Sequence, residues 1–417
     1  MSGIAGLRGT GNWGTDERPK NFRESILFFN PNGTAAIFGL TAKAGKKTVN
    51  DPEFAWWAET MNLMRLQVNG ALSSSDTTIT VDSSDPSSSA MYRTYGTATH
   101  LKPGDLLLVE PSADAATFDH ELLRVEQVFS DTQFSVSRGV GGTSAASISN
   151  DAYLLLVGSA YAEGTSAPSA TSRNPVKFYN YTQIFKDTYE LTGTADSTDA
   201  RTGDPWSNDK KRKMFDHARS IEMSILFGRK AETTGSNGKP LRFMGGLREF
   251  IPQATPANGG RTTIFGAAVT PASFLDAVSP AYDFDTDGGD TRIAMGGNQA
   301  LVELSKVFQS ATNAKMELGN VVKLYGLDMR EFILPRGRVL FYSHPLLSQH
   351  AIYKKSMFIL DFASIKYVAL KGRDTKAHDD VQAKDEDVRR GYVQTECSLA
   401  VDRGGLTCAY LGNISAT

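Results

Sequence analysis

The sequence predicts an α+β protein in which a small all-β unit is inserted into a larger mixed body. Three observations predict it: short β-type runs follow one another closely between residues 77 and 157, one long amphipathic helix begins near Ser207, and β-type segments dominate the chain after Phe332. A chain of 417 residues is long enough to bury a large core and to divide into two or three domains.

Residues 1–50 have the composition of an arm rather than of a domain. Glycines punctuate its first residues, and it carries seven basic against three acidic side chains, with Lys43, Lys46 and Lys47 at its basic end. Such a segment buries too little apolar surface to fold alone, so we expect it to lie on a neighbour.

Two aromatic segments, residues 54–69 and 176–192, flank the all-β unit. Side chains in the second segment alternate in two sets, as in a long β-ribbon. We expect the two segments to be the arms of one long hairpin with the all-β unit at its tip.

The inserted unit is strongly acidic. Residues 70–165 carry four basic and twelve acidic side chains, a net charge of −8, whereas the whole chain has −2 and the rest of it therefore +6. This asymmetry indicates two surfaces that face different surroundings, although chance variation in an independent domain is an alternative. Runs at residues 77–81, 105–109, 121–128, 133–136 and 153–157 predict a small barrel or sandwich between Ser/Thr/Ala-rich linkers at 83–90 and 164–174.

The best helix covers residues 207–230. Its predicted buried stripe is Met214, Ala218, Ile221 and Ile225, with Ser207 or Asn208 as the N-cap and Gly228 at the end. Its first turns are basic, which the helix dipole disfavours. An anionic partner explains this run, and a solvated charge run explains it equally well; the residues are Lys210, Lys211, Arg212 and Lys213.

The C-terminal half mixes one helix with many strands. A second helical segment covers residues 295–312, and strands are predicted at 332–334, 339–342, 358–360 and 365–370, followed by a charged loop at 371–390. A closing hairpin pairs residues 395–401 with 406–412, which makes Cys397 and Cys408 diagonal neighbours. They are then too far apart for an unstrained disulfide, so we expect free, buried thiols.

Three segments match part of a catalytic or ligand-binding motif, but each lacks a residue or a structural context that the motif needs. The GxGxxG letters at residues 9–14 lack a preceding strand, and the calcium-loop start at 283–288 has Ala294 where a Glu ligand belongs. His120 and Glu121 are followed by Arg124 where a zinc protease has its second His. We therefore expect no enzyme, no metal and no cofactor. The chain has no apolar run of about 20 residues and no secretory signal, so we expect assembly in a host cytoplasm without a membrane.

The order of arm, long hairpin, helix and α/β remainder resembles the major capsid proteins of tailed bacteriophages with the Hong Kong 97 fold, in the subgroup with an inserted β-domain. The resemblance rests on the order of five short segments: residues 21–28 (NFRESILF), 180–185 (NYTQIF), 222–228 (EMSILFG), 244–247 (MGGL) and 395–399 (TECSL). Residues 138–143 (RGVGGT) in addition resemble a turn that recurs in phage structural β-modules.

The resemblance implies a division of the chain into the parts of that fold. These are an arm at 1–50, an extended loop at 51–72 and 173–205, the inserted domain at 73–172, a peripheral domain with the spine helix at 206–270 and 350–417, and an axial domain at 271–349. It implies a virion protein that assembles with itself into hexamers and pentamers of an icosahedral head around double-stranded DNA. Scaffold, portal and decoration proteins are its expected partners, with nonspecific contact to packaged DNA.

We expect the aromatic residues of the hairpin to contact neighbouring subunits, because an isolated hairpin cannot keep them in water. They are Trp56, Trp57, Tyr179, Tyr181 and Phe185; packing on their own subunit is the alternative. The residues expected to face DNA are Lys43, Lys46, Lys47, Lys210, Lys211, Arg212 and Lys213. The rival functions are a phage tail or decoration protein, which needs neither the long helix nor the hairpin, and an enzyme of unrecognised type.

Overall fold

The structure is a computed structural model that describes residues 45–59, 65–83, 96–110, 120–168, 170, 175–198, 203–253, 255, 260–310, 321–324 and 327–416. The glycine motif at residues 9–14 and Lys43 lie outside the described residues.

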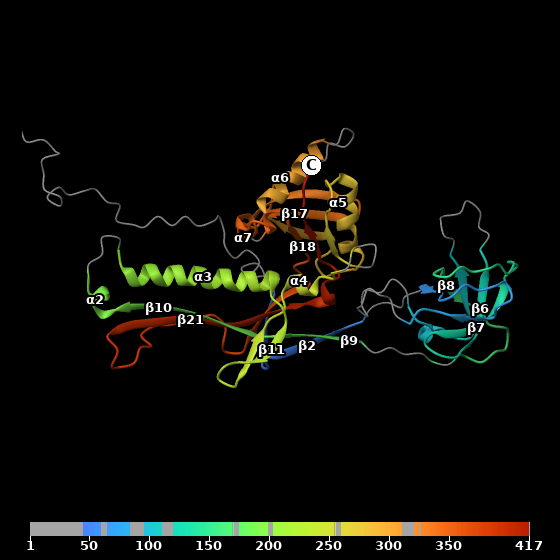
Figure 1. The fold of residues 1–417 in the computed structure, drawn as a ribbon, viewed down its shortest axis with the longest axis horizontal. Helices are drawn as coiled ribbons and strands as arrows, with labels where there is room; N and C mark the ends of the chain where they lie inside the picture. Colours follow the sequence, from blue (N-terminus) through green and yellow to red (C-terminus); the bar gives the residue numbers. More distant parts are fainter. Residues whose placement is uncertain are drawn as a thin grey trace, which may run out of the picture.

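A long, narrow sheet forms one side of the body. Its strand order is β1 (Lys46–Val49), β19 (Ile365–Leu370), β21 (Val388–Val401) and β10 (Gln183–Thr192), and β20 (Lys376–His378) also pairs with β21. β10 and β21 run antiparallel over ten residue pairs, from Gln183↔Cys397 to Thr192↔Val388. Helix α3 (Pro205–Phe227) lies along this pair for most of its length (Figure 1).

Helix α3 begins earlier than predicted, and it buries a different face. Asp204 is the N-cap, accepting hydrogen bonds from the backbone N–H groups of Trp206 and Ser207, and Pro205 occupies the first turn. Caps at Ser207 or Asn208 are therefore wrong. Ile221 and Ile225 are buried as predicted, but Met214 is 45% exposed, and His217 and Glu222 are buried. Hydrophobic periodicity misses this face because two of its members are polar groups that find buried partners.

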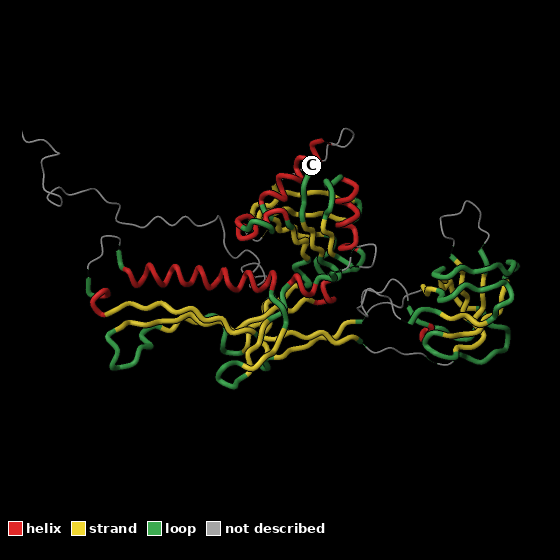
Figure 2. Tube along the Cα trace, viewed as in Figure 1, coloured by secondary structure: helices red, strands yellow, loops and turns green. Residues whose placement is uncertain are grey.

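A seven-stranded sheet forms the second part of the body. Its order is β13 (Thr262–Ile264), β22 (Ala409–Gly412), β18 (Met357–Leu360), β14 (Thr291–Gly296), β17 (Gly337–Ser343), β16 (Leu327–Leu334) and β15 (Val321–Leu324). The helices around it are α5 (Pro271–Val278), α6 (Asn298–Ser310) and α7 (Pro345–Gln349), as Figure 2 shows. The sheet takes strands from both of the segments assigned to the peripheral and axial domains.

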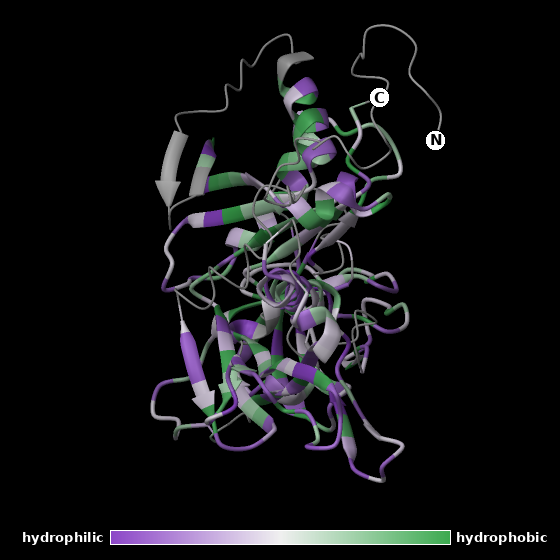
Figure 3. Cartoon of the chain, turned by 90° about the vertical axis from the view of Figure 1, so that its left-hand side faces the viewer, coloured by the Kyte–Doolittle hydropathy of each residue, from purple (hydrophilic) through white to green (hydrophobic). Residues whose placement is uncertain are grey.

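Two hydrophobic clusters hold this body together. One joins α3 to the inner faces of both sheets through residues such as Ile225, Phe358 and Leu399, and the other packs α5 and α6 on the seven-stranded sheet around Phe274. Figure 3 shows hydrophilic and hydrophobic residues mixed over the body, while β18 and β22 in the seven-stranded sheet are buried along their whole length. The predicted second helix starts at Asn298 rather than 295, because Met295 and Gly296 complete β14.

The predicted closing hairpin is wrong, although both of its strands exist. β21 pairs with β10, β19 and β20, while β22 pairs with β13 and β18, so the strands belong to different sheets. A 3-10 turn at Asp402–Gly405 carries the chain from one sheet to the other. Cys397 and Cys408 are free and buried, as predicted.

The long hairpin exists, but it is shorter than predicted. β2 (Glu53–Ala58) pairs antiparallel with β9 (Val176–Tyr181), from Glu53↔Tyr181 to Ala58↔Val176. Residues beyond this ribbon join other sheets: Gln183 onwards enters β10, and β3 (Arg65–Gln67) enters the acidic unit.

The acidic unit is a six-stranded sheet with its own core. Its order is β3, β8 (Tyr153–Ser159), β5 (Asp105–Val109), β6 (Leu122–Val128), β7 (Gln133–Val140) and β4 (Thr78–Thr80). A bridge between Val68 and Val81 joins the two end strands, with Asn69 N–H donating to Thr80 O at 2.9 Å, so the sheet closes into a small barrel. Each predicted strand run of this unit falls on or overlaps an observed strand.

A buried ion pair fixes the loops at one side of the barrel. Arg138 Nε and Nη2 each donate to Glu121 at 2.7 Å, and its Nη1 donates to the carbonyls of Ser73 and Asp76 at 2.9 Å. Burial alone would raise the pKa of Glu121, but hydrogen bonds from Arg138 and from the backbone N–H groups of Ala146 and Gly139 outweigh burial and lower it.

Replacing Arg138 by Met should therefore destabilise the barrel. The change leaves Glu121 buried without its cation, which costs about 3–5 kcal/mol in the free energy of unfolding. Hydrogen exchange in the strands β5 to β8 of the full chain measures the loss. Arg124→Met removes an exposed pair with Glu126 from the same barrel and should cost at most about 1 kcal/mol.

The same pair predicts how the barrel responds to acid. Because the pKa of Glu121 is lower in the folded state than its ordinary value of 4.5, its contribution is complete above that pH and is lost as the pH falls through the depressed value. The stability difference between wild type and Arg138→Met should narrow on acidification below pH 4.5. A constant difference at every pH contradicts the assignment.

Candidate assembly interface

The inner face of the ribbon β2–β9 packs on the body of its own chain. Trp56 stacks with Phe178 at 6.2 Å between ring centroids and contacts Phe250 at 5.8 Å. Strand alternation places Phe54 on this same face. Trp56 therefore anchors the ribbon within its own chain.

The ribbon is also fixed by one buried amide. Asn180 Nδ2 donates to Gly245 O at 3.0 Å and to Leu399 O at 2.7 Å, while its Oδ1 accepts from Gly245 N–H at 2.8 Å. The side chain thus ties β9 to β21 and to the segment after α3. That segment approaches the helix end so closely that a Cβ on Gly246 would lie 2.6 Å from Ser224 O, so only glycine fits there.

The outer face of the ribbon carries the cross-strand pairs Glu53–Tyr181, Ala55–Tyr179 and Trp57–Lys177. Lys230 covers the Tyr179 ring, with Nζ 3.7 Å from its centroid. Burial lowers the pKa of Lys230, and the nearby carboxylates of Glu249 and Glu53 oppose this shift. The base of the outer face is thus partly covered by the chain itself.

Tyr181 lies beside a second hairpin, β11 (Ala231–Thr234) paired with β12 (Pro240–Phe243). Burial raises the pKa of Tyr181, with a further contribution from Glu53 and a smaller one from Glu232 of that hairpin. At the other end of the ribbon Trp57 has no such cover and is 64% exposed. Trp57 is therefore the bare apolar group of the outer face.

The five aromatic residues proposed as subunit contacts divide into three groups. Phe185 is only 8% exposed and lies edge-on to His217 at 6.3 Å, so it belongs to its own chain's core. Trp56 packs on that core, Tyr179 and Tyr181 are half-buried, and Trp57 alone of the five is exposed. Alternation along the strand predicts two faces, but it does not say which face the rest of the chain covers.

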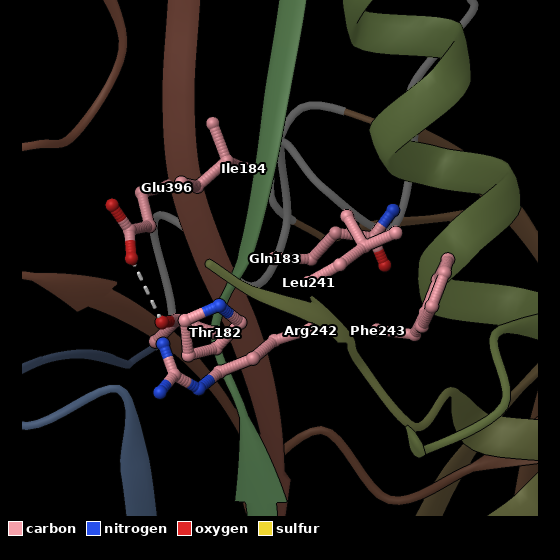
Figure 4. A pocket seen from close by; sticks show the side chains of 8 residues that line it. Thr182, Gln183, Ile184, Leu241, Arg242, Phe243 and Glu396 are labelled. Atoms are coloured by element: carbon pink, nitrogen blue, oxygen red, sulfur yellow. Dashed lines mark hydrogen bonds between the residues drawn. The ribbon is translucent and has the colours of Figure 1, made fainter. Parts of the chain in front are cut away.

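A shallow groove lies between β10 and the hairpin β11–β12, and sequence reasoning missed it. Its volume is about 230 Å³, and Figure 4 shows its lining: Thr182, Gln183, Ile184, Pro240, Leu241, Arg242, Phe243 and Glu396. Ile184, Leu241 and Phe243 are 50%, 48% and 38% exposed. The sequence does contain a signal for the hairpin β11–β12, because the run Gly235-Ser236-Asn237-Gly238 is typical of a turn between two strands.

One wall of the groove is fixed by a chain of polar contacts. Thr182 Oγ1 donates to Glu396 at 3.0 Å, and Arg373 holds the other oxygen of this carboxylate. Arg242 Nε donates to Glu232 at 3.1 Å, which positions the opposite wall. The groove thus combines apolar side chains with one ion pair at its rim.

The most enzyme-like constellation lies under α3. His217 Nδ1 is 2.6 Å from Asp187, and its Nε2 is 2.8 Å from the hydroxyl of Thr395. This order of groups resembles a hydrolase triad, but Thr395 is fully buried, and no substrate reaches it. The three residues connect the helix to β10 and β21.

Of the six expected basic residues that the structure describes, three form ion pairs within the chain. Lys46 contacts Asp374, and Lys210 contacts Asp379 at 2.5 Å. Arg212 lies 3.7 Å from Asp209, while Lys47 and Lys211 are exposed and Lys213 is half-buried. Among the described residues, no group of three or more His, Cys, Asp or Glu side chains is arranged to hold a metal ion, and no helix is long and apolar enough to cross a membrane.

Comparison with known proteins places this geometry in context. A family model described as SU10 major capsid protein matches residues 5–413. The major capsid protein of Pseudomonas phage PaMx41 is 28% identical over 411 residues, covering 97% of this chain and 91% of that protein.

Solved structures give more distant similarities. The capsid of cyanophage A-1(L) is 9% identical with a TM-score of 0.47, covering 96% of this chain and 98% of that one. A structure of Microbacterium phage Oxtober96 is 11% identical with a TM-score of 0.41, covering 95% and 96%.

Proposed function

Because this chain belongs to the SU10 family of major capsid proteins and is thus a structural component of a phage virion, we propose that it builds the head as hexamers and pentamers of an icosahedral shell around double-stranded DNA. The observation that carries the proposal is the ribbon β2–β9, which keeps Trp57 at 64% exposure on a fixed element. An exposed indole on a rigid strand suits a contact between subunits, because it buries a large area for little lost conformational freedom.

The parts of the chain fit the Hong Kong 97 arrangement as follows. α3 is the spine helix, and the long sheet beneath it belongs to the peripheral domain. The seven-stranded sheet with α5 and α6 forms the core of the axial domain, which thus extends beyond the expected 271–349 to include β13, β18 and β22. The ribbon β2–β9 is the extended loop, and the barrel is a domain inserted at its tip. The separate core of the barrel supports this division. The proposed role is structural and includes no catalytic step. Scaffold, portal and decoration proteins are the proposed partners of the assembled chain.

The double variant Trp57→Ala/Tyr181→Ala should remain a folded subunit that assembles poorly. Trp57 contributes little to its own chain's core, so its loss affects the contact rather than the fold. Thermal unfolding of the subunit and electron microscopy of assembled particles separate the two effects. Ile333→Ala/Ile352→Ala removes side chains that are 74% and 72% exposed elsewhere, and it serves as the matched control. Normal shells from the ribbon variant would refute the proposal.

We propose that the basic surface outside the barrel faces packaged DNA. Lys47 and Lys211 carry this proposal best, because both are exposed and have no ion pair in the part of the chain that the structure describes. Lys47→Gln/Lys211→Gln should weaken DNA binding by assembled protein and reduce its salt dependence, since each phosphate contact releases counterions. Filter binding at several salt concentrations measures both. The proposal is contradicted if the variant's DNA affinity depends on salt concentration as steeply as that of the wild type. It is also contradicted if the inner face of the assembled shell is more negative than the outer face.

We propose that the acidic barrel lies on the outside of the shell. A unit of net charge −8 beside DNA would be repelled, whereas outside it favours dispersal of particles. Insertion into a surface loop is also cheap, at about 0.6 kcal/mol per doubling of loop length. Its role there is to stabilise the lattice or to vary the exterior. Protease treatment of intact particles should cut the linker at residues 166–173, part of which lies outside the described residues. Cleavage only after the shell is broken places the barrel inside.

A further inference from the structure

We propose that the groove between β10 and β12 is the receptor for Trp57 of a second copy of this chain. The inference rests on the proposed function and deepens it, because it names the surface that the exposed ribbon contacts. The groove and Trp57 are the two apolar features left open along one continuous run of strands.

Both partners expose apolar surface without cover. Trp57 is 64% exposed, and the groove presents Ile184 and Leu241 at 50% and 48%. Ile184, Leu241 and Phe243 all line this one hollow, so their exposed surface is grouped rather than scattered, and such patches mark contact sites. The body of the chain fixes both partners: Asn180 holds the ribbon, and Glu396 with Thr182 holds one wall of the groove.

The size of the groove selects the kind of occupant. Its volume of about 230 Å³ is below the ~300–1,000 Å³ of small-molecule and cofactor sites. A single bulky side chain supplied by another protein surface is a better match. An indole buried in such a hollow is the usual form of an interface hot spot.

Charge complementarity also favours Trp57. Arg242 lines the groove with its side chain 30% exposed, and a guanidinium lies favourably on the electron-rich face of an indole. Lys177, the cross-strand neighbour of Trp57, is 47% exposed beside Glu53. Glu232 on the hairpin is 39% exposed and gives Lys177 a partner when the two surfaces meet.

Trp57 cannot fill the groove of its own chain. Trp57 pairs with Lys177, and Lys177 precedes Gln183 of the groove by six residues along β9 and β10. At ~3.3 Å per residue, about 20 Å separates Trp57 from the groove. A second copy must therefore supply the indole. Contacts of this head-to-tail type join different surfaces of each subunit and generate closed rings when the rotation permits.

Cross-linking in assembled particles tests the contact directly. Ala55→Cys and Leu241→Cys place one thiol on the outer face of the ribbon beside Trp57 and one in the groove, and both keep Trp57 in place. A short bismaleimide should then give a ladder of covalent multimers from the double variant. Native Cys397 and Cys408 interfere little, because both are buried and burial raises the pKa of each thiol to about 12.

The controls distinguish the proposed contact between copies from chance collisions of exposed thiols. Either single variant should give no ladder, and particles mixed from the two single variants should give dimers only. Ala55→Cys/Ile352→Cys pairs the same ribbon thiol with an exposed site elsewhere and should give no ladder. Particles that assemble from the double variant without cross-links overturn the proposal.

An assembly measurement supplies a second, independent readout. Leu241→Glu places a carboxylate in the groove, and loss of a hot spot of ~2 kcal/mol should raise the protein concentration needed for half-maximal assembly about thirtyfold. Ile352→Glu should leave it unchanged. If Leu241→Glu leaves assembly unchanged while the ribbon variant impairs it, the groove assignment fails and the proposed function stands. If wild-type protein forms no shells, the proposed function fails.

Discussion

The attachment of helix α3 to both sheets is the constraint on which the rest of the structure depends. Two histidine–carboxylate contacts reinforce the hydrophobic cluster that α3 shares with both sheets: His217 with Asp187 of β10, and Glu222 with His344 at the start of α7, at 2.6 and 2.7 Å. Glu222 and His344 are both fully buried. Loss of one member of such a pair costs ~3–5 kcal/mol, because the other stays buried alone. The helix is about 34 Å long at 1.5 Å per residue, so these two contacts align two sheets along one rigid axis.

That rigid axis gives the ribbon a fixed position on the body of the chain. A two-stranded ribbon is marginally stable alone, but Asn180 and the inner aromatic face fix its base to the body at the end of α3. Trp57 is then held in a defined position while exposed to solvent, and a fixed side chain loses less conformational entropy in a contact such as the one proposed for it. The barrel beyond the ribbon has its own core and its own buried ion pair, Arg138 with Glu121, so it folds around contacts that the body does not supply. The ribbon is thus fixed to the body at its base and joined at its other end to a unit with its own core. This arrangement suits the contact between subunits that we propose for it.

The sequence predicted most of the helices and strands correctly, but beyond the ribbon it did not predict which strands pair or which faces pack together. The barrel strands, the ribbon pairing and the long helix were all recognised, because alternation and helical period are local properties. The pairing of residues 395–401 with 406–412 was wrong, since a turn between two strands has the same residues whether they pair with each other or enter two sheets. The stripe on α3 was predicted through Met214, which is exposed, because a buried face that includes His217 and Glu222 has no apolar signature. The groove was missed entirely: its lining comes from β10, β12 and β21, and nothing local relates those strands.

By itself, the sequence determined the α+β class, the acidic barrel strands, the free and buried cysteines and the aromatic character of the ribbon. Each of these follows from composition or from spacing along a single segment, and burial of apolar surface enforces it in almost any tertiary arrangement. Only the tertiary structure decided that Phe185 and Trp56 belong to the chain's own core while Trp57 stays bare, and that Ile184 and Leu241 share one hollow. These outcomes depend on which surfaces cover one another. Which surfaces are covered depends on the packing of segments more than two hundred residues apart, such as Asn180 with Leu399, and no local sequence pattern predicts that packing.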